Sequence, residues 1–237
     1  MTDTASGKAP RNAGISVTVT HYDWSVDGTV QTSWPLTGVT NAAGLYSIAG
    51  APFGIDIVGG DTVSARYSVP RTSNQVTVNA TAPYVIGFLD RAHVSGYALP
   101  NAKTLLTIKN RMGKLVFTAE CRTSLSGQFS LVLTDGLGST TLRPNMGVAL
   151  DLPGVSVTLP RVGGRLNVGA KRVDGFGPPN LYIRISTQSP FFTHYGQIDK
   201  RGRFSVDLSP GGGVSEGTLV SLVVRLAGGD LVYRYIE

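Results

Sequence analysis

The sequence has few of the residues that build disulfide scaffolds, metal sites or membrane-spanning helices. Its 237 residues include one cysteine and three histidines, and only 15% are charged. A single cysteine, Cys121, forms no internal disulfide and no cysteine-rich metal cluster. No stretch approaches the roughly 18–20 consecutive apolar residues that a spanning helix needs. We therefore expect no disulfide framework, no metal, no cofactor and no membrane partner.

Helical patterns are also missing, because no run of ten residues combines helical periodicity with caps. The chain instead has 30 glycines and 13 prolines among abundant Val, Thr and Ser. This composition is typical of many short strands joined by tight turns. Residues 1–14 contain no basic region followed by an apolar one, so no secretory signal is visible. We expect an all-β protein.

The formal net charge of +6 raises nucleic acid as a partner. The basic residues are scattered among the expected strands, and the densest group, Lys200, Arg201 and Arg203, lies in an expected turn. Neither a basic helix, a zinc finger nor an aromatic RNA-binding motif accompanies them. A solvated basic surface is the interpretation we favour, with no specific nucleic-acid partner.

One short pattern occurs three times along the chain. It reads Gly-Leu-Tyr-Ser-Ile at 44–48, Gly-Gln-Phe-Ser-Leu at 127–131 and Gly-Arg-Phe-Ser-Val at 202–206. Each glycine follows turn residues and begins an alternating strand. Side chains alternate between the two faces of a strand, so Tyr46, Phe129 and Phe204 are predicted to be equivalent core residues, each stabilising chiefly its own repeat.

A second landmark precedes the first two copies. Residues 6–13 and 95–102 are identical at five of eight positions, and Val168-Gly169 followed by Pro178-Pro179-Asn180 is a looser third copy. A further turn and strand follow each Gly-aromatic-Ser motif. Three landmarks in one order predict three β-sandwich repeats at residues 1–83, 84–163 and 164–237, with boundaries near Ala82-Pro83 and Val162-Gly164 and very short linkers. The segment from Lys171 to Gly177 reads as an insert.

The order of these landmarks resembles the tandem bacterial Ig-like and prealbumin-like, or carboxypeptidase-regulatory-like, modules. Modules of this kind recur on bacterial surfaces and in phage virions. The resemblance implies a spacer, a stalk or a binding platform, and it brings no catalytic residues.

Catalysis is not expected from the residues either. His21, His93 and His194 occupy unrelated positions in the three repeats. None of them accompanies a nucleophile elbow or a metal-binding helix motif. We therefore expect a protein that is not an enzyme.

Two aromatic clusters are the candidate interaction sites. They consist of Tyr22, Trp24 and Trp34 in the first repeat, and of Phe191, Phe192 and Tyr195 in the third. Aromatic rims stack on sugars or anchor protein interfaces. The alternative is that these side chains cap the ends of their own sandwiches.

Two functions remain open from the sequence. The first is a structural protein of a virus particle, such as a phage tail or capsid-surface component involved in host attachment. The alternative is a fragment of a bacterial cell-surface adhesin or stalk, with a carbohydrate-binding module as a weaker choice. Partners are then other structural subunits, in a homo-oligomer or larger assembly, or a host surface glycan. The final strand, residues 230–236, is expected either to pair within its own sheet or to dock on a neighbouring subunit.

Overall fold

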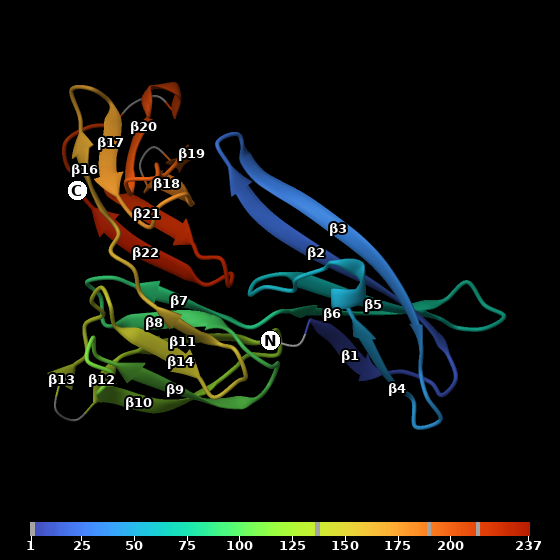
Figure 1. The fold of residues 1–237 in the computed structure, drawn as a ribbon. Helices are drawn as coiled ribbons and strands as arrows, with labels where there is room; N and C mark the ends of the chain where they lie inside the picture. The colour runs from blue at the N-terminus through green and yellow to red at the C-terminus, as the bar shows by residue number, and fades with distance from the viewer. Residues whose placement is uncertain (1–2, 136–137, 189–190, 212–213) are drawn as a thin grey trace. The chain divides into compact units, whose positions relative to one another are not determined.

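Strands make up nearly all of the regular structure in a computed structural model that describes residues 3–135, 138–188, 191–211 and 214–237 (Figure 1). In those residues the helical elements are two short 3-10 turns, η1 (Ala51–Phe53) and η2 (Ser209–Gly211). The all-β prediction is confirmed. Contacts divide the chain into unit 1, residues 1–22 and 31–83, and unit 2, residues 23–30 and 84–237.

Unit 1 is built on a two-stranded and a four-stranded sheet, ordered β1-β4 and β3-β2-β5-β6, with the tips of β2 and β3 assigned to unit 2. The strands are β1 (Thr4–Lys8), β2 (Gly14–Ser25), β3 (Gly28–Val39), β4 (Leu45–Ala49), β5 (Thr62–Ser68) and β6 (Gln75–Thr81). Alternation sets the inner face, because Ile15, Val17 and Val19 of β2 are buried at every second position. Together with Leu36 and Ile48 they form the core of the unit.

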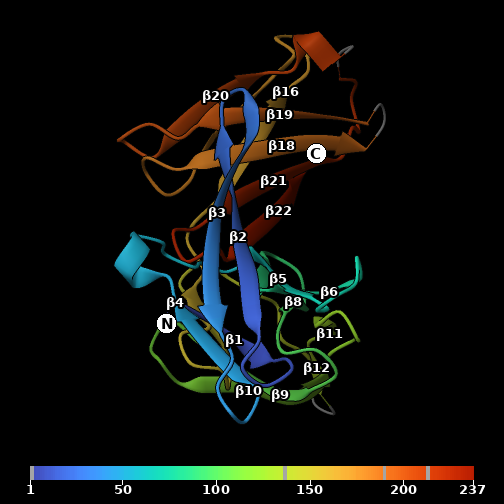
Figure 2. The ribbon, with the colours of Figure 1, turned by 90° about the vertical axis from the view of Figure 1, so that its right-hand side faces the viewer.

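Unit 2 contains a seven-stranded sheet, β11-β8-β7-β22-β21-β18-β19, a four-stranded sheet, β10-β9-β14-β15, and a three-stranded sheet, β16-β17-β20. Figure 2 shows β18, β19, β21 and β22 side by side. Residues 84–158 supply β7 (Tyr84–Phe88), β8 (His93–Tyr97), β9 (Lys103–Lys109), β10 (Leu115–Arg122), β11 (Gln128–Val132), the short pair β12 (Thr134–Asp135) and β13 (Gly138–Ser139), β14 (Gly147–Leu150) and β15 (Ser156–Thr158). Residues 163–236 supply β16 (Gly163–Asn167), β17 (Arg172–Phe176), β18 (Tyr182–Gln188), β19 (Phe191–Gln197), β20 (Arg203–Asp207), β21 (Val220–Arg225) and β22 (Leu231–Ile236).

The seven-stranded sheet joins the second and third repeats through one parallel pair. Strand β7 pairs with β22, placing Ile86 opposite Leu231 and Phe88 opposite Tyr233. The amide of Leu89 extends the pair by donating to the Tyr233 carbonyl over 2.8 Å. Strand β22 also pairs with β21, so the final strand has a neighbour on both sides within its own chain. The division into three domains stays a prediction, and the second and third repeats share one sheet.

A glycine beneath an aromatic ring recurs in all three repeats. Gly7 lies opposite Tyr46 across β1 and β4, and Gly96 lies opposite Phe129 across β8 and β11. Both rings lie over their glycine: a Cβ on Gly7 would be 2.6 Å from the Tyr46 hydroxyl oxygen, and one on Gly96 would be 3.0 Å from the Phe129 ring. A side chain at either position would therefore displace the ring. The sequence motif thus marks two facing positions of one sheet.

The third copy of this pair corrects the sequence alignment. Gly175 of β17 lies opposite Phe204 of β20, so the landmark in the third repeat begins at Asp174-Gly175. Val168 and Gly169 lie in the turn between β16 and β17, and most of the expected insert, Lys171 to Gly177, is strand β17. The corrected alignment also superposes three asparagines with positive φ, Asn12 (55°), Asn101 (49°) and Asn180 (63°).

The turn before each aromatic strand has the same hydrogen bonds in all three repeats. One side-chain oxygen, from Asn41, Ser124 or Asp199, accepts two backbone amides over distances of 2.8–3.3 Å. The glycine that ends the turn has a φ of 75°, 88° or 76°, a region that favours glycine. The chain therefore repeats a local structure as well as a pattern of letters.

Candidate interaction surfaces

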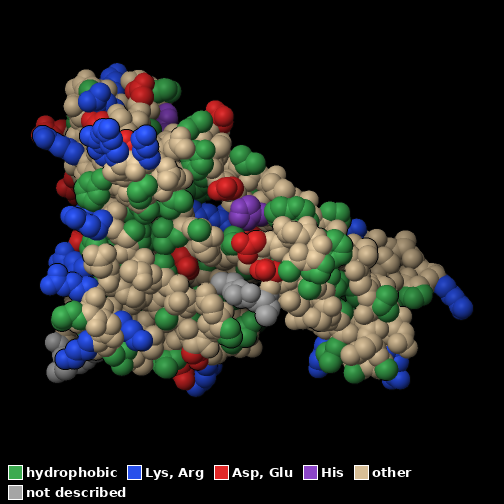
Figure 3. Space-filling view, in the orientation of Figure 1, with side chains coloured by type: hydrophobic (Ala, Val, Ile, Leu, Met, Phe, Trp, Pro, Cys, Tyr) green, Lys and Arg blue, Asp and Glu red, His purple; other side chains and the backbone are tan. Residues whose placement is uncertain are grey.

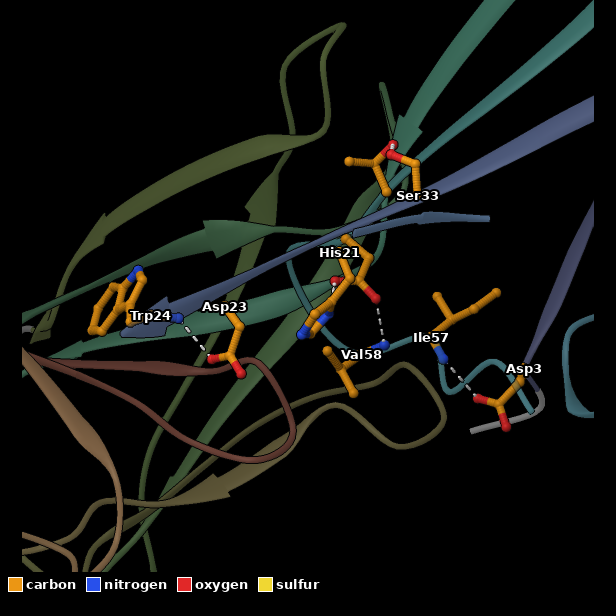
Figure 4. A network of polar contacts seen from close by, with 9 residues as sticks. Asp3, His21, Asp23, Trp24, Ser33, Ile57 and Val58 are labelled. Atoms are coloured by element: carbon orange, nitrogen blue, oxygen red, sulfur yellow. Dashed lines mark hydrogen bonds and ion pairs between the residues drawn. The ribbon is translucent and has the colours of Figure 1, made fainter. Parts of the chain in front are cut away.

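Trp24 and Tyr195 are the two aromatic candidates that come together. Trp24, near the end of β2, is only 8% exposed, and its ring meets that of Tyr195 edge to face with centroids 6.0 Å apart. The guanidinium of Arg184 lies over the Trp24 ring at 5.2 Å, in cation–π geometry. Figure 4 shows the Trp24 backbone amide donating to the Asp23 carboxylate at 2.7 Å. All four residues belong to unit 2.

Polar contacts fix the rest of this cluster. Arg184 donates through Nη2 to the Tyr233 hydroxyl at 2.8 Å, and the Tyr195 hydroxyl is 3.2 Å from Oγ1 of Thr29. Arg184 Nε is buried with no partner among the described residues. Arg184 and Tyr195 cover the indole ring of Trp24, and as an interaction residue Trp24 stays a prediction.

The other four candidates are dispersed. Trp34 is partly buried in unit 1, with its ring 6.3 Å from that of His21, and Tyr22 is partly buried on β2. Phe192 packs against the core of unit 2 and meets His194 edge to face at 5.2 Å. Phe191 alone among the six is exposed, at 79%. As interaction residues these positions stay predictions.

A buried carboxylate in unit 1 holds the turn before β5. Asp61 is fully buried and accepts from the Val58 amide at 3.0 Å, and its other oxygen is 2.7 Å from His21 Nδ1. In the same region Asp3 accepts the Ile57 amide at 3.2 Å (Figure 4). The Asp61 carboxylate therefore joins His21 of β2 to the turn at Val58.

No cluster of three or more potential metal ligands occurs among the described residues. No helix found in those residues is long and apolar enough to cross a membrane. On the face seen in Figure 3, Lys and Arg side chains lie at several separated places and form no single basic patch. That distribution matches the scattered basic residues of the sequence.

The joint between the second and third repeats contains a buried acid. Asp230, in the turn before β22, accepts the Val85 amide at the start of β7 over 2.8 Å. Burial raises the pKa of the Asp230 carboxyl, and the hydrogen bond from Val85 opposes this in part. Beside it, burial is also the main cause that raises the pKa of Tyr84 to about 12, and the Tyr84 ring stacks on Tyr97 at 5.3 Å.

One ion pair also crosses this joint. Asp90, which follows β7, binds Arg234 of β22 at 2.9 Å, and within its own repeat it binds Arg143 at 2.7 Å. Arg234 also donates to the Val162 carbonyl at 2.8 Å. The third repeat is therefore held to the second by side chains as well as by the shared sheet.

A groove in unit 1 is the surface that the sequence reasoning missed. It has a volume of about 310 Å³ and runs between β1 and the inner face of β5 and β6, where Val76 and Val78 are exposed. One signal was present in the sequence. A strand-like segment, Tyr84-Phe88, precedes the landmark at Ser95, whereas residues 1–5, which precede the landmark at Ser6, contain no such apolar pattern.

No protein-family model matches the sequence, and no curated protein matches it significantly. Solved structures match at low identity. A tetra-tandem repeat in the extending region of a large adhesion protein is 16% identical with a TM-score of 0.24, over 98% of this chain and 69% of that one. A bacterial ice-binding adhesin is 14% identical with a TM-score of 0.21, over 98% and 88%. The central fibronectin-III array of RIM-binding protein is 11% identical with a TM-score of 0.21, over 100% and 93%. Neither the phage origin nor the prealbumin-like part of the expected resemblance finds support in them.

Proposed function

We propose that this chain is a non-enzymatic structural segment of a bacterial surface protein, in which tandem β-sandwich repeats form a stiff spacer between adhesive or anchoring parts. The observation that carries this proposal is the joint within residues 84–237, where β7 of one repeat pairs with β22 of the next. A flexible linker behaves as a random coil and lets neighbouring domains move freely. A shared sheet removes that freedom, which is what a spacer needs.

The polar contacts of the joint support the same role. Asp230 holds the first strand of the second repeat, and Asp90 binds arginines on both sides. The contacts of Asp230 with Val85 and of Asp90 with Arg234 restrict movement between the two repeats, and these polar groups already have partners. The solved structures named above include adhesin repeats, the class of protein proposed here. Because their TM-scores are low, the support for the proposal comes from the joint.

The other sequence-based functions have less support. The virion hypothesis has no structural observation in its favour. Among the six aromatic candidates only Phe191 offers the exposed ring that sugar stacking requires, so we do not propose glycan binding. Contacts with other structural subunits remain part of the proposal, because a spacer works inside a larger assembly.

Immunolabelling of intact cells tests the proposal. Antibodies raised against the purified chain are expected to label the surface of the source cells, and brief external proteolysis is expected to remove the label. Antibody that has been preabsorbed with the purified chain is the control. Label confined to the cytosol, or found only on purified virus particles, would refute the surface role.

A further inference from the structure

In the part of the chain that the structure describes, the sheet β1-β4 of unit 1 has no counterpart of a strand that the corresponding sheets of the later repeats contain. In the second repeat β7 pairs antiparallel with β8, and in the third β16 pairs antiparallel with β17. Strand β1 is the counterpart of β8 and β17, because each carries the glycine that faces the aromatic motif. Within the described residues β1 pairs with β4 alone. Its other edge is therefore open for pairing.

Hydrogen bonds align the last hairpin of the first repeat with that of the second. The Gly60 amide donates to the Ala82 carbonyl at 3.0 Å, as the Asn145 amide donates to the Leu159 carbonyl at 2.7 Å. The return bonds, from the amides of Ala82 and Leu159, also match, at 2.8 and 2.9 Å. Ala82 is thus equivalent to Leu159, which makes Val78 equivalent to Val155 and Ala80 equivalent to Val157.

These equivalent side chains differ sharply in burial. Val155 and Val157 are 3% and 8% exposed in the second repeat, where β7 packs against β14 and β15. Val78 is 64% exposed in the first repeat, and Ala80 is exposed as well. The groove therefore occupies the place that a strand fills in the sister repeat. Its walls include Ala5, Ile15, Tyr46, Val63, Val78 and Ala80.

The sister repeat also shows which chemistry the groove accepts. Val85, Gly87 and Leu89 are buried at alternate positions of the segment that fills the equivalent place. Glycine fits at position 87 because a Cβ would lie 2.5 Å from a methyl carbon of Leu159, and that side chain would have to move. Unit 1 has the smaller Ala82 in the place of Leu159, so its groove has room for a larger side chain at the glycine position.

We propose that the open edge of β1 and the groove beside it bind an extended strand from another β-sandwich repeat of this type. The strand adds antiparallel to β1 and covers Val78 and Ala80. Both later repeats receive this strand from the segment that leaves the preceding repeat, since β7 follows β6 directly and β16 follows β15. In strand addition, backbone hydrogen bonds give affinity and alternate side chains give specificity. The identity of the donor rests on the function proposed above, whereas the site rests on the sister repeats alone.

A strand fused to the full chain tests the site. A copy of residues 84–91 replaces residues 1–2. In the fusion, Thr4 then follows the copied Tyr84 at the same spacing at which His93 follows Tyr84 in the second repeat. The fused strand is expected to raise the melting temperature of unit 1 by about 5–15 °C. It should also slow hydrogen exchange of the β1 amides at least tenfold. A second version with valine at the copied Gly87 position should stabilise unit 1 further, because Ala82 leaves room for it.

Two matched controls keep the test specific. The same extension with aspartate at the copied Val85 and Gly87 positions should give no increase. Val78→Asp should leave the parent chain folded, because Val78 is 64% exposed, and should abolish the gain from the fused strand. An unchanged melting temperature with the original extension would overturn the site. That outcome is separate from surface labelling of cells, which tests the spacer role alone.

In trans, a synthetic peptide of residues 82–91 should protect the same β1 amides of the unmodified chain. Protection of amides elsewhere, with β1 unchanged, would also overturn the assignment. The Asp-substituted peptide is the control. Protection by that peptide would contradict the proposal that the groove binds alternate apolar side chains.

Discussion

Truncation of Phe129 or Phe204 tests whether residues 84–237 unfold as one body. Both rings are nearly buried, at 4% and 6% exposed, and each lies over a glycine on the neighbouring strand. Replacing a buried Phe by Ala costs about 3–5 kcal/mol. The upper part of that range is expected, because the glycine beneath each ring has no side chain that could move into the space.

Calorimetry of the full chain measures the effect. For a unit of this size, 1 kcal/mol lowers the melting temperature by about 2–4 °C, so each variant should lower one shared transition by roughly 8–20 °C. Tyr46→Ala should lower the other transition, that of unit 1, and by less, because Tyr46 is only partly buried. Phe191→Ala is the control: its ring is 79% exposed, and the change should stay within about 0.5 kcal/mol of the parent.

Two outcomes would refute this reasoning. If Phe129→Ala and Phe204→Ala lowered two different transitions, the second and third repeats would be independent beads, and the shared sheet would not couple them. If Tyr46→Ala lowered the same transition as the other two, the division into two units would have no thermodynamic meaning.

Asp230→Asn keeps an acceptor for the Val85 amide and removes a charge whose burial raises the pKa of the native carboxyl. Native Asp230 binds its proton more tightly than the unfolded chain does, so its contribution to stability falls as pH rises from the unfolded pKa through the raised native pKa. Thermal scans of the Asn variant at pH 4 and pH 7 should not show this loss of stability, and an Asn variant less stable than the parent at pH 7 would contradict the reasoning. Asp230→Ala should lower the free energy of unfolding by about 1–3 kcal/mol, because it leaves the Val85 amide unpaired. Gly175→Ala should strongly destabilise unit 2 in urea, because its Cβ would lie 2.3 Å from a backbone oxygen, and the control Gly169→Ala, whose nearest atom is at 3.8 Å, should not. In a spectrophotometric titration one phenol, Tyr84, should ionise near pH 12, and loss of this late titration in Tyr84→Phe identifies it.

The local structure was largely predictable from the sequence. The Gly-aromatic-Ser motifs predicted the buried rings of Phe129 and Phe204 because turn glycines and strand alternation act within a few residues, whereas Tyr46 is only partly buried. The third copy of the upstream landmark was misplaced, because the glycine of Val168-Gly169 is a turn residue that resembles the true position, Gly175. Distinguishing the two required the strand register, which places Gly175 opposite Phe204.

The joint and the groove were not predictable in the same way. Strands β7 and β22 are separated by more than 140 residues, as the Val85–Asp230 contact shows, and no local pattern marks a parallel pair at that distance. The burial of Trp24 likewise depends on Arg184, which lies far along the chain on β18. An aromatic residue near a turn reads as exposed until its distant neighbours are known.

The parallel direction of β7 and β22 has a mechanical consequence. Strand β7 begins residues 84–237 and β22 lies at their end, so a pull on these two ends draws the paired strands in opposite directions along their common axis. Under that load the hydrogen bonds of the pair, with that of Leu89 to Tyr233 among them, are sheared together. In an antiparallel pair the same two ends would lie side by side, so the load would break the hydrogen bonds one after another. The unit should therefore resist extension up to a single high rupture force, at which the whole pair slides.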